Sequence, residues 1–306
     1  YISRCLDSIL VQKYAGELEI ICVDDGSTDN SSQIIREYAN HNSNIRIISQ
    51  SNKGAAAARN AGMDAARGKY ISFIDADDYI LDGLYSEFSR VISNGDIDIY
   101  MFNGLVENGV YNTQSTFFTS NIFKLGVTEN DCFNYSKIAD FFYGNQGIWN
   151  KIYRADFLKR HNFRLLEGCI FEDTLFNFVT IINAEKIRFT YKKFYKYMIN
   201  PRSVTNSIGK NSLDLFKIFE AMECEAKKIN LEYFFSYALF QLEYEKIIET
   251  LGLTKPEFRQ ELFNKAQEFL KNRITRLNPQ IYLKLININF GLALLNYTYE
   301  QFCNTL

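Results

Sequence analysis

Two short apolar segments in the first quarter of the chain each end in a cluster of aspartates. Residues 18–23 (Leu-Glu-Ile-Ile-Cys-Val) run into Asp-Asp-Gly-Ser-Thr-Asp at 24–29, and residues 70–74 (Tyr-Ile-Ser-Phe-Ile) run into Asp-Ala-Asp-Asp at 75–78. Apolar runs of this length, bounded by turn residues, predict buried strands of a largely parallel sheet. Carboxylates packed at neighbouring strand ends repel one another unless a cation or hydrogen-bond donors lie between them. Ligands of open α/β sheets bind outside the carboxyl ends of the strands, so the pattern predicts a metal and nucleotide site.

Strand and helix patterns alternate along the rest of this region. The elements we expect here are a helix over 30–41, a strand over 45–48, and a Gly turn opening an Ala-rich helix over 52–62. The later elements are a strand over 98–102, a helix, loop and helix over 151–184, a strand over 188–198, and helices from about residue 211 to the end. The alternation predicts a doubly wound, mostly parallel α/β sheet with helices on both faces. We expect an α/β domain over residues 1–205 and a helical region over 206–306.

Histidine and cysteine usage limits the chemistry. With only two His, a His-based metal site or a Ser-His-Asp triad is not expected. The six Cys are scattered without a Cys-x-x-Cys pair, which predicts a reducing compartment with neither disulfides nor zinc. No run approaches the ~18 apolar residues of a transmembrane helix, and no signal peptide is visible. We therefore expect a cytoplasmic location.

Charge is distributed unevenly, with an acidic excess before about residue 98 and a basic excess after it. The stretch 186–202 is both basic and aromatic, a pattern that also occurs in nucleic-acid-binding proteins. We favour a strand with one apolar and one solvated face, and expect no nucleic-acid partner. The basic helical tail leaves two alternatives open: peripheral association with the inner face of an anionic membrane, or a bundle covering the α/β domain.

The clustered side chains fit particular roles, each beside a structural alternative. The spacing Asp-x-Asp-Asp after a buried strand suits a hard divalent cation, although solvated acidic turns are common. Capping of the next helix needs only one side chain, for which we favour Asp29 or Ser27. One of the pair Asp24 and Asp25 is therefore expected to accept a hydrogen bond from an N–H group of a nucleotide base. Lys53 and Arg59 flank a helix start, where backbone N–H groups and positive side chains favour the binding of phosphates. An ordinary amphipathic helix with a surface arginine would show the same pattern.

Taken together, these segments resemble family 2 glycosyltransferases of the GT-A fold. The resemblance rests on residues 18–29, 52–62 and 70–79, and on two later segments, Gly-Ile-Trp-Asn-Lys-Ile-Tyr at 147–153 and Phe-Glu-Asp-Thr-Leu-Phe at 171–176. It covers about residues 1–205. The resemblance implies an inverting transferase that uses a nucleotide-sugar, usually a UDP-sugar, with Mg²⁺ or Mn²⁺. The implied acceptor is a glycan or a lipid-linked molecule, in bacterial surface-polysaccharide biosynthesis.

The resemblance also implies roles for individual residues on the donor side. Asp24 and Asp25 match the acids that contact uracil, with Asp25 preferred, and Arg59 matches a nucleotide-side arginine. Asp75 matches the acid of the DXD motif near the ribose and the metal. Asp77 is then the primary metal ligand and Asp78 a flanking one.

On the acceptor side, the pair Glu172 and Asp173 matches the motif whose aspartate is the catalytic base. Trp149, in the preceding segment, is expected to stack on an acceptor sugar and Glu172 to contact the acceptor. For Trp149 the alternative is core packing. For Asp173 the alternative is a first-turn acid stabilised by the helix dipole.

An inverting transfer requires a carboxylate near the attacking hydroxyl and a positive charge close to the departing phosphates. It does not require a histidine. Family members begin with a strand that ends in a Pro-x-Tyr-Asn-type segment, and this sequence starts after it, so we expect one sheet strand fewer. Two other functions are kept as alternatives. One is a metal-dependent phosphatase or nucleotidyltransferase, although the sequence shows neither a nucleophilic Asp with a Lys partner nor a Gly-rich phosphate loop. The other is a non-catalytic glycan-binding scaffold with a decayed transferase fold.

Overall fold

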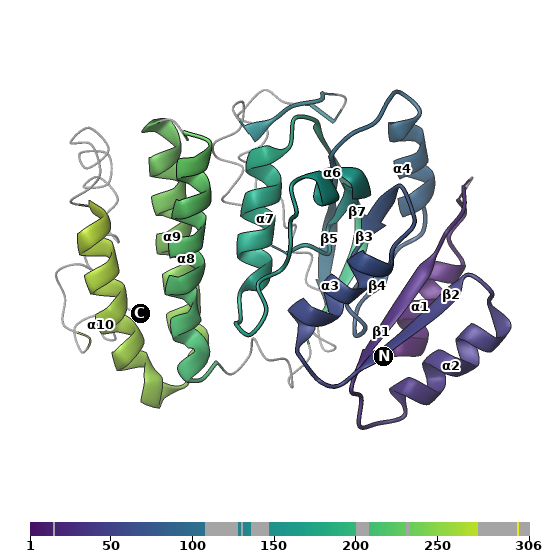
Figure 1. Cartoon of the computed structure of the whole chain (residues 1–306), viewed down its shortest axis with the longest axis horizontal. Coiled ribbons are helices and arrows are strands. Elements are labelled where there is room, and N and C mark those ends of the chain that lie inside the picture. Colours follow the sequence, from purple (N-terminus) through teal and green to yellow (C-terminus); the bar gives the residue numbers. More distant parts are fainter. Residues whose placement is uncertain are drawn as a thin grey trace. The chain divides into compact units, whose positions relative to one another are not determined.

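The computed structural model describes residues 1–14, 16–107, 128–129, 131–135, 147–199, 208–230, 233–274 and 299. The chain divides into two compact units (Figure 1). The first, here called the α/β unit, comprises residues 1–168 and 172–200. The second, the helical unit, comprises residues 169–171 and 201–306. Residues 108–127, 136–146 and 275–298, as well as Cys303, lie outside the described residues.

The α/β unit begins with the predicted alternation of helices and strands. Its first elements are α1 (Ile2–Leu10), β1 (Ile20–Asp25), α2 (Ser31–His41), β2 (Ile45–Gln50) and α3 (Ala55–Ala65). β1 and β2 pair in parallel, with Ile20 opposite Ile45 (Figure 1). Both of these residues are buried, as expected for the apolar starts of strands covered by helices.

A five-stranded sheet follows, in the order β3-β6-β5-β7-β4. Its strands are β3 (Tyr70–Ser72), β4 (Tyr79–Ile80), β5 (Ile99–Glu107), β6 (Lys151–Arg154) and β7 (Ile187–Met198). The α/β class is confirmed, but this sheet is mixed where a mostly parallel one was expected. Only β5 and β7 pair in parallel, because β4 and β6 run back against their neighbours.

Strand β6 takes up the first four residues of the segment 151–184, where the sequence suggested a helix, a loop and a helix. Ile152 and Tyr153 are buried, and Tyr153 pairs with Ile71 of β3 on one side and Ile99 of β5 on the other. Pairing on both sides satisfies the backbone of this segment, so tertiary contacts override the local helical pattern. The helices α6 (Ala155–Arg160) and α7 (Glu172–Asn183) follow.

The edges of β1 and β3 face a cavity instead of each other. Within the described residues β1 pairs only with β2, and β3 only with β6. The cavity has a volume of about 800 Å³ and is lined by residues of both strands, by α3, and by the aromatic side chains of Tyr14, Tyr85 and Phe88. The parallel pair β1–β2 is therefore separate from the larger sheet.

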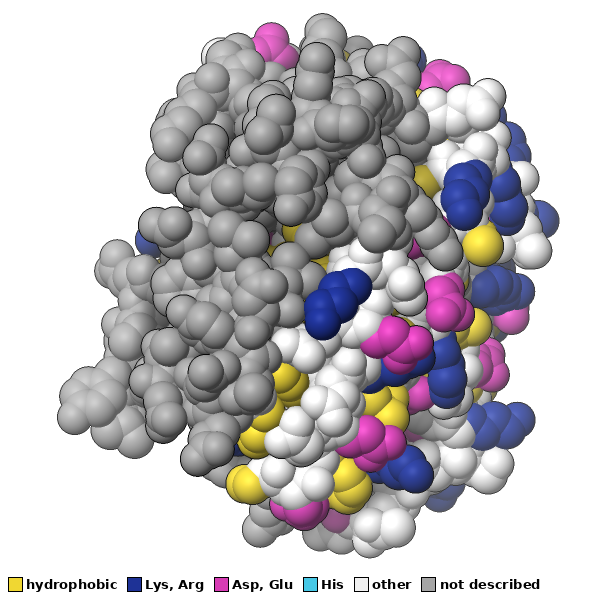
Figure 2. All heavy atoms as spheres, turned by 90° about the vertical axis from the view of Figure 1, so that its left-hand side faces the viewer, with side chains coloured by type: hydrophobic (Ala, Val, Ile, Leu, Met, Phe, Trp, Pro, Cys, Tyr) yellow, Lys and Arg dark blue, Asp and Glu magenta, His cyan; other side chains and the backbone are white. Residues whose placement is uncertain are grey.

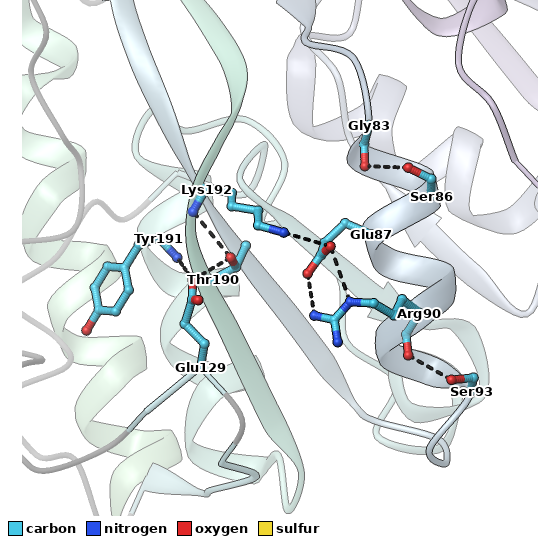
Figure 3. A network of polar contacts seen from close by, with 9 residues as sticks. All are labelled: Gly83, Ser86, Glu87, Arg90, Ser93, Glu129, Thr190, Tyr191 and Lys192. Atoms are coloured by element: carbon cyan, nitrogen blue, oxygen red, sulfur yellow. Dashed lines mark hydrogen bonds and ion pairs between the residues drawn. The ribbon is translucent and has the colours of Figure 1, made fainter.

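Helix α4 (Leu84–Ile92) is attached to β7 by charged side chains (Figure 3). Glu87 of α4 accepts a hydrogen bond from Lys192 of β7 at 2.9 Å, and the same carboxylate is held by Arg90 one turn along. The hydrogen bond from Arg90 is the main reason that the pKa of Glu87 lies below its ordinary value. On the other side of β7, Glu129 accepts from the hydroxyl of Thr190 at 2.6 Å.

The helical unit contains a short 3₁₀ helix, η4 (Lys210–Leu213), and the helices α8 (Asp214–Lys228), α9 (Tyr233–Leu253) and α10 (Pro256–Ile274). Arg273 of α10 links the other two long helices, through Glu223 of α8 at 3.1 Å and Glu243 of α9 at 2.9 Å. The helical pattern predicted from residue 211 is thus confirmed as far as residue 274.

Basic and acidic side chains are mixed on the described part of the face drawn in Figure 2. In the portion of the chain that the structure describes, no helix combines the length and the apolar content needed to cross a lipid bilayer.

Candidate active site

Asp25, at the end of β1, fixes the loop that leads into α3. Its Oδ1 atom accepts hydrogen bonds from the side-chain amide of Gln50 at 2.7 Å and from the backbone N–H of Lys53 at 2.8 Å. Its Oδ2 atom accepts from the backbone N–H of Gly54 at 2.8 Å, where φ is +91° and glycine is favoured. Burial alone would raise the pKa of Asp25, but these hydrogen bonds hold it below its ordinary value. A carboxylate has about four lone-pair positions, so Asp25 retains acceptor capacity for a ligand.

Asp24 shapes the turn after β1. It is buried, and its Oδ1 atom accepts from the backbone N–H of Ser27 at 2.9 Å. Hydrogen bonds from Ser27 hold the pKa of Asp24 below its ordinary value. Asp29 accepts from the N–H of Ser31, the first residue of α2, at 2.9 Å, but the N-cap residue is Asn30 and neither Asp29 nor Ser27. The two adjacent aspartates therefore both organise loops, Asp24 its own and Asp25 the one before α3.

Arg59, one turn into α3, connects two acidic segments. Its Nη2 atom donates to Oδ1 of Asp75 at 2.7 Å, and its Nη1 atom donates to Oε1 of Glu172 at 2.9 Å. The guanidinium is mostly buried, with 20% of the side chain exposed. Since the loop before α3 is held by Asp25, this one helix joins all three of the acidic segments predicted from the sequence.

The predicted metal-binding residues lie on a tight turn after β3. The N–H of Asp78 donates to the carbonyl of Asp75 at 3.0 Å and closes the turn. Asp78 is buried, and its two carboxylate oxygens accept from the N–H of Met198 at 2.7 Å and the hydroxyl of Tyr195 at 2.8 Å. Burial raises the pKa of Asp78 to about 7. Asp77 is half-buried, and no described residue donates a hydrogen bond to its carboxylate.

Glu172 and Asp173 form the first turn of α7. Phe176, on the same helix, packs edge-on against Phe73 and Tyr153 and so anchors this turn beside β3 and β6. Burial raises the pKa of Glu172, helped by the neighbouring Asp173 and opposed by Arg59. Within the described residues, the half-buried carboxylate of Asp173 has no hydrogen-bond or ion-pair partner. It is thus placed to accept a proton or a ligand hydroxyl.

Trp149 does not lie open to a ligand in this structure. It is 6% exposed, and its indole stacks on the ring of Tyr195 with centroids 4.4 Å apart and planes 24° apart. The backbone of Gly104 also lies against the indole, and an added Cβ at this position would come within 2.9 Å of it. The structure therefore favours core packing for Trp149 over the expected stacking on an acceptor sugar, because the side chain is almost fully buried.

Two residues near this site were not found from the sequence. Lys151 is fully buried, and its Nζ atom donates to the carbonyl of Gly147 at 2.6 Å and to Oδ1 of Asn150 at 2.8 Å. Burial lowers the pKa of Lys151 to about 7. Its only sequence signal was its place in the segment 147–153. Tyr195 had no signal at all, because the aromatic stretch around it predicts a strand and nothing more specific.

The cavity between β1 and β3 reaches part of the predicted site. Arg59 and Asp75 line it, whereas Asp25, Asp77 and Asp173 do not. Among the residues that the structure describes, no three His, Cys, Asp or Glu side chains are arranged to hold a metal ion. Mg²⁺ sites in nucleotide-binding proteins often use one or two carboxylates and complete the shell with water and substrate phosphates. Asp75 and Asp77 fit a site of this kind, in which two carboxylates hold the cation together with water and substrate phosphates.

Comparison with known proteins identifies the family. The sequence pattern of glycosyl transferase family 2 matches residues 1–157, half of the chain. The chain belongs to this family. The match includes β1, α3 and the turn after β3, which together carry the aspartate clusters and Arg59. It also favours the transferase over the phosphatase alternative.

Two curated bacterial relatives of this family 2 chain align with most of it. An uncharacterized glycosyltransferase, YibD, of Escherichia coli is 28% identical over 75% of this chain and 67% of its own length. An uncharacterized glycosyltransferase, EpsJ, of Bacillus subtilis is 30% identical over 70% of this chain. The alignment spans 62% of EpsJ, so it leaves more than a third of that protein unmatched.

Among solved structures, TarS of S. aureus resembles the family 2 chain along its whole length. Its complex with UDP superposes with a TM-score of 0.69 at 20% identity, covering 100% of this chain and 88% of the TarS chain in that structure, which spans residues 1–349. Its complex with UDP-GlcNAc gives a TM-score of 0.67 at 22% identity. At this level of identity the likeness establishes the GT-A-type fold and leaves ligands to be argued from the site.

Proposed function

We propose that this chain transfers a sugar from a nucleotide-sugar, most simply a UDP-sugar, to a hydroxyl of a glycan or lipid-linked acceptor, with inversion at the anomeric carbon. The observation that carries the proposal is the position of Arg59, which joins Asp75 to the turn that bears Asp173. Membership of family 2 supports the reaction class. The UDP and UDP-GlcNAc complexes of TarS support the donor class.

The donor side is assigned to the loops at the ends of β1 and β3. Asp25 offers its remaining acceptor position to the base, beside Asp24, and Lys53 is exposed next to them. Asp75 and Asp77 would hold a divalent cation, which supplies positive charge for the departing diphosphate when it is bound. Asp78 has both carboxylate oxygens engaged by the protein, so we assign it to holding the turn.

The acceptor side is assigned to the first turn of α7. Asp173 takes the proton of the acceptor hydroxyl as its oxygen attacks the anomeric carbon. The attack comes from the face opposite the diphosphate, whose bond to the anomeric carbon breaks with the electron pair leaving on UDP. Arg59 neutralises part of the charge of Asp75 and Glu172, so that the approaching diphosphate meets less repulsion. Glu172 keeps one oxygen for the acceptor.

The decisive experiment is calorimetry with UDP in the presence and absence of Mn²⁺, followed by UDP release from a panel of UDP-sugars. We expect binding that depends on Mn²⁺ and a preference for one donor sugar. The variant Asp77→Asn should weaken the Mn²⁺-dependent binding about tenfold or more. The matched control is Asp82→Asn, an exposed acid just after β4, which should bind as the unmodified chain does.

Two results would contradict the proposal. Release of phosphate from p-nitrophenyl phosphate without any donor preference would favour the phosphatase alternative. Absence of UDP binding under all metal conditions would favour the non-catalytic scaffold.

Bacterial surface-polysaccharide assembly is the setting we propose, and transfer to isolated surface glycans would test it.

A further inference from the structure

The hydroxyl of Tyr195 bridges the first and last residues of the turn that carries the proposed cation ligands. It accepts a hydrogen bond from the backbone N–H of Asp75 at 3.2 Å and donates one to Oδ2 of Asp78 at 2.8 Å. Tyr195 lies on β7, 120 positions from Asp75 in the sequence, and is fully buried. One side chain from a distant strand therefore contacts both ends of this turn.

The remaining contacts of the turn leave Asp77 projecting from a fixed backbone. The N–H of Met198 holds the second oxygen of Asp78 at 2.7 Å, and Arg4 of α1 donates to the carbonyl of Asp77 at 3.1 Å. The carboxylate of Asp77 itself receives no hydrogen bond from the described residues. The backbone is thus restrained from both sides while this one carboxylate stays available.

The ring of Tyr195 is also held in place. Trp149 stacks on it at a centroid distance of 4.4 Å, and Trp149 is in turn packed against Gly104. A ring restrained in this way has little freedom to move its hydroxyl away from the turn. The segment that contains Trp149 is therefore connected to the turn by its packing on Tyr195.

We propose that Tyr195 is the positioning residue for the cation-binding turn and that Trp149 supports it. Tyr195 acts through Asp75 and Asp78, and the inference rests on the proposed function in assigning the cation to Asp75 and Asp77. Removing the hydroxyl frees one carboxylate oxygen of Asp78 and the N–H of Asp75, so the carboxylates of Asp75 and Asp77 lose their fixed relative position. Cation-dependent binding of a nucleoside diphosphate then weakens.

Tyr195→Phe tests this inference, because it removes the hydroxyl and keeps the ring that stacks on Trp149. The matched control is Tyr100→Phe on β5, where the hydroxyl is also buried and forms no hydrogen bond of normal geometry with any described residue. By calorimetry, Tyr195→Phe should weaken Mn²⁺-dependent UDP binding about tenfold and leave metal-free UDP binding unchanged. Tyr100→Phe should change neither.

A second readout needs no ligand: amide hydrogen exchange of residues 75–79 in the full chain. Exchange there should be faster in Tyr195→Phe than in Tyr100→Phe. Unchanged exchange, or an equal loss of UDP binding with and without Mn²⁺, would overturn the inference. If the unmodified chain does not bind UDP at all, the proposed function fails, and the exchange rates alone decide whether Tyr195 holds the turn.

Discussion

Nη1 of Arg59 donates a hydrogen bond to Oε1 of Glu172 at 2.9 Å, across 113 positions of the sequence. The other side of the same guanidinium pairs with Asp75. Arg59 is therefore the counter-charge for two carboxylates that would otherwise repel each other and the third carboxylate at Asp173. Its ion pairs therefore connect α3, the turn after β3 and the start of α7.

Replacing Arg59 should affect stability and ligand binding together. In Arg59→Met, Asp75 and Glu172 lose a mostly buried hydrogen-bond donor, which costs on the order of 1–3 kcal/mol of unfolding free energy. Arg59→Lys keeps the charge but cannot reach both carboxylates with a planar fork, so its loss should be intermediate. Urea unfolding and UDP calorimetry measure the two effects. UDP affinity in Arg59→Met equal to that of the unmodified chain would contradict the proposed role.

Asp173→Asn should abolish turnover and spare donor binding. The amide occupies the same volume but cannot accept the hydroxyl proton, and general bases contribute about 10²- to 10⁴-fold to the rate. UDP release from the preferred donor gives kcat, and calorimetry gives the UDP affinity. The control is Asp156→Asn, an exposed acid in the first turn of α6. Normal turnover in Asp173→Asn would remove Asp173 as the base.

Asp25→Asn should loosen the start of α3. The amide lacks one acceptor oxygen, so at least one of the donors Gln50, Lys53 and Gly54 loses its partner. We expect faster amide exchange at Lys53 and Gly54 and a loss of about 1–2 kcal/mol in unfolding free energy. The pKa of Asp25 in the folded chain lies below its ordinary value. The stabilising effect of Asp25 should therefore be lost as the pH falls below the ordinary pKa and through the lowered pKa of the folded chain. Exchange rates that match those of the unmodified chain would show that the loop is held by other contacts.

Glu243 should make the stability of the helical unit depend on pH. Burial raises its pKa from 4.5 to about 7 although Arg273 opposes the shift. The folded chain then binds more protons than the unfolded chain between these two values, so stability falls as the pH rises from 4.5 towards 7. Glu243→Gln should flatten this dependence and gain stability relative to the unmodified chain at pH 8, by on the order of 2 kcal/mol.

Thermal unfolding at pH 5 and pH 8 measures the effect of Glu243→Gln. The control is Glu245→Gln, an exposed glutamate on the same helix. If Glu243→Gln differs from the unmodified chain by the same amount at both pH values, Glu243 does not titrate in this range.

Much of the α/β framework could be predicted locally. The strands ending at Asp25 and before Asp75, the helices α2 and α3 and the strand β7 follow from short-range patterns of apolar and turn residues. The helices of the C-terminal region follow from the same kind of pattern. The segment over 151–154 could not be predicted in this way, because a strand there depends on pairing with β3 and β5.

By itself, the sequence determined which chemistry is available: carboxylates at strand ends, an arginine at a helix start and almost no histidine. Only the tertiary structure decided which carboxylates are free. Asp78 is held by Tyr195 and Met198, Asp25 holds a loop, and Trp149 is enclosed, whereas the carboxylates of Asp77 and Asp173 have no partner among the described residues. The physical reason is that a hydrogen bond needs its two groups within about 3 Å, and groups more than a hundred positions apart meet only when the whole fold has formed.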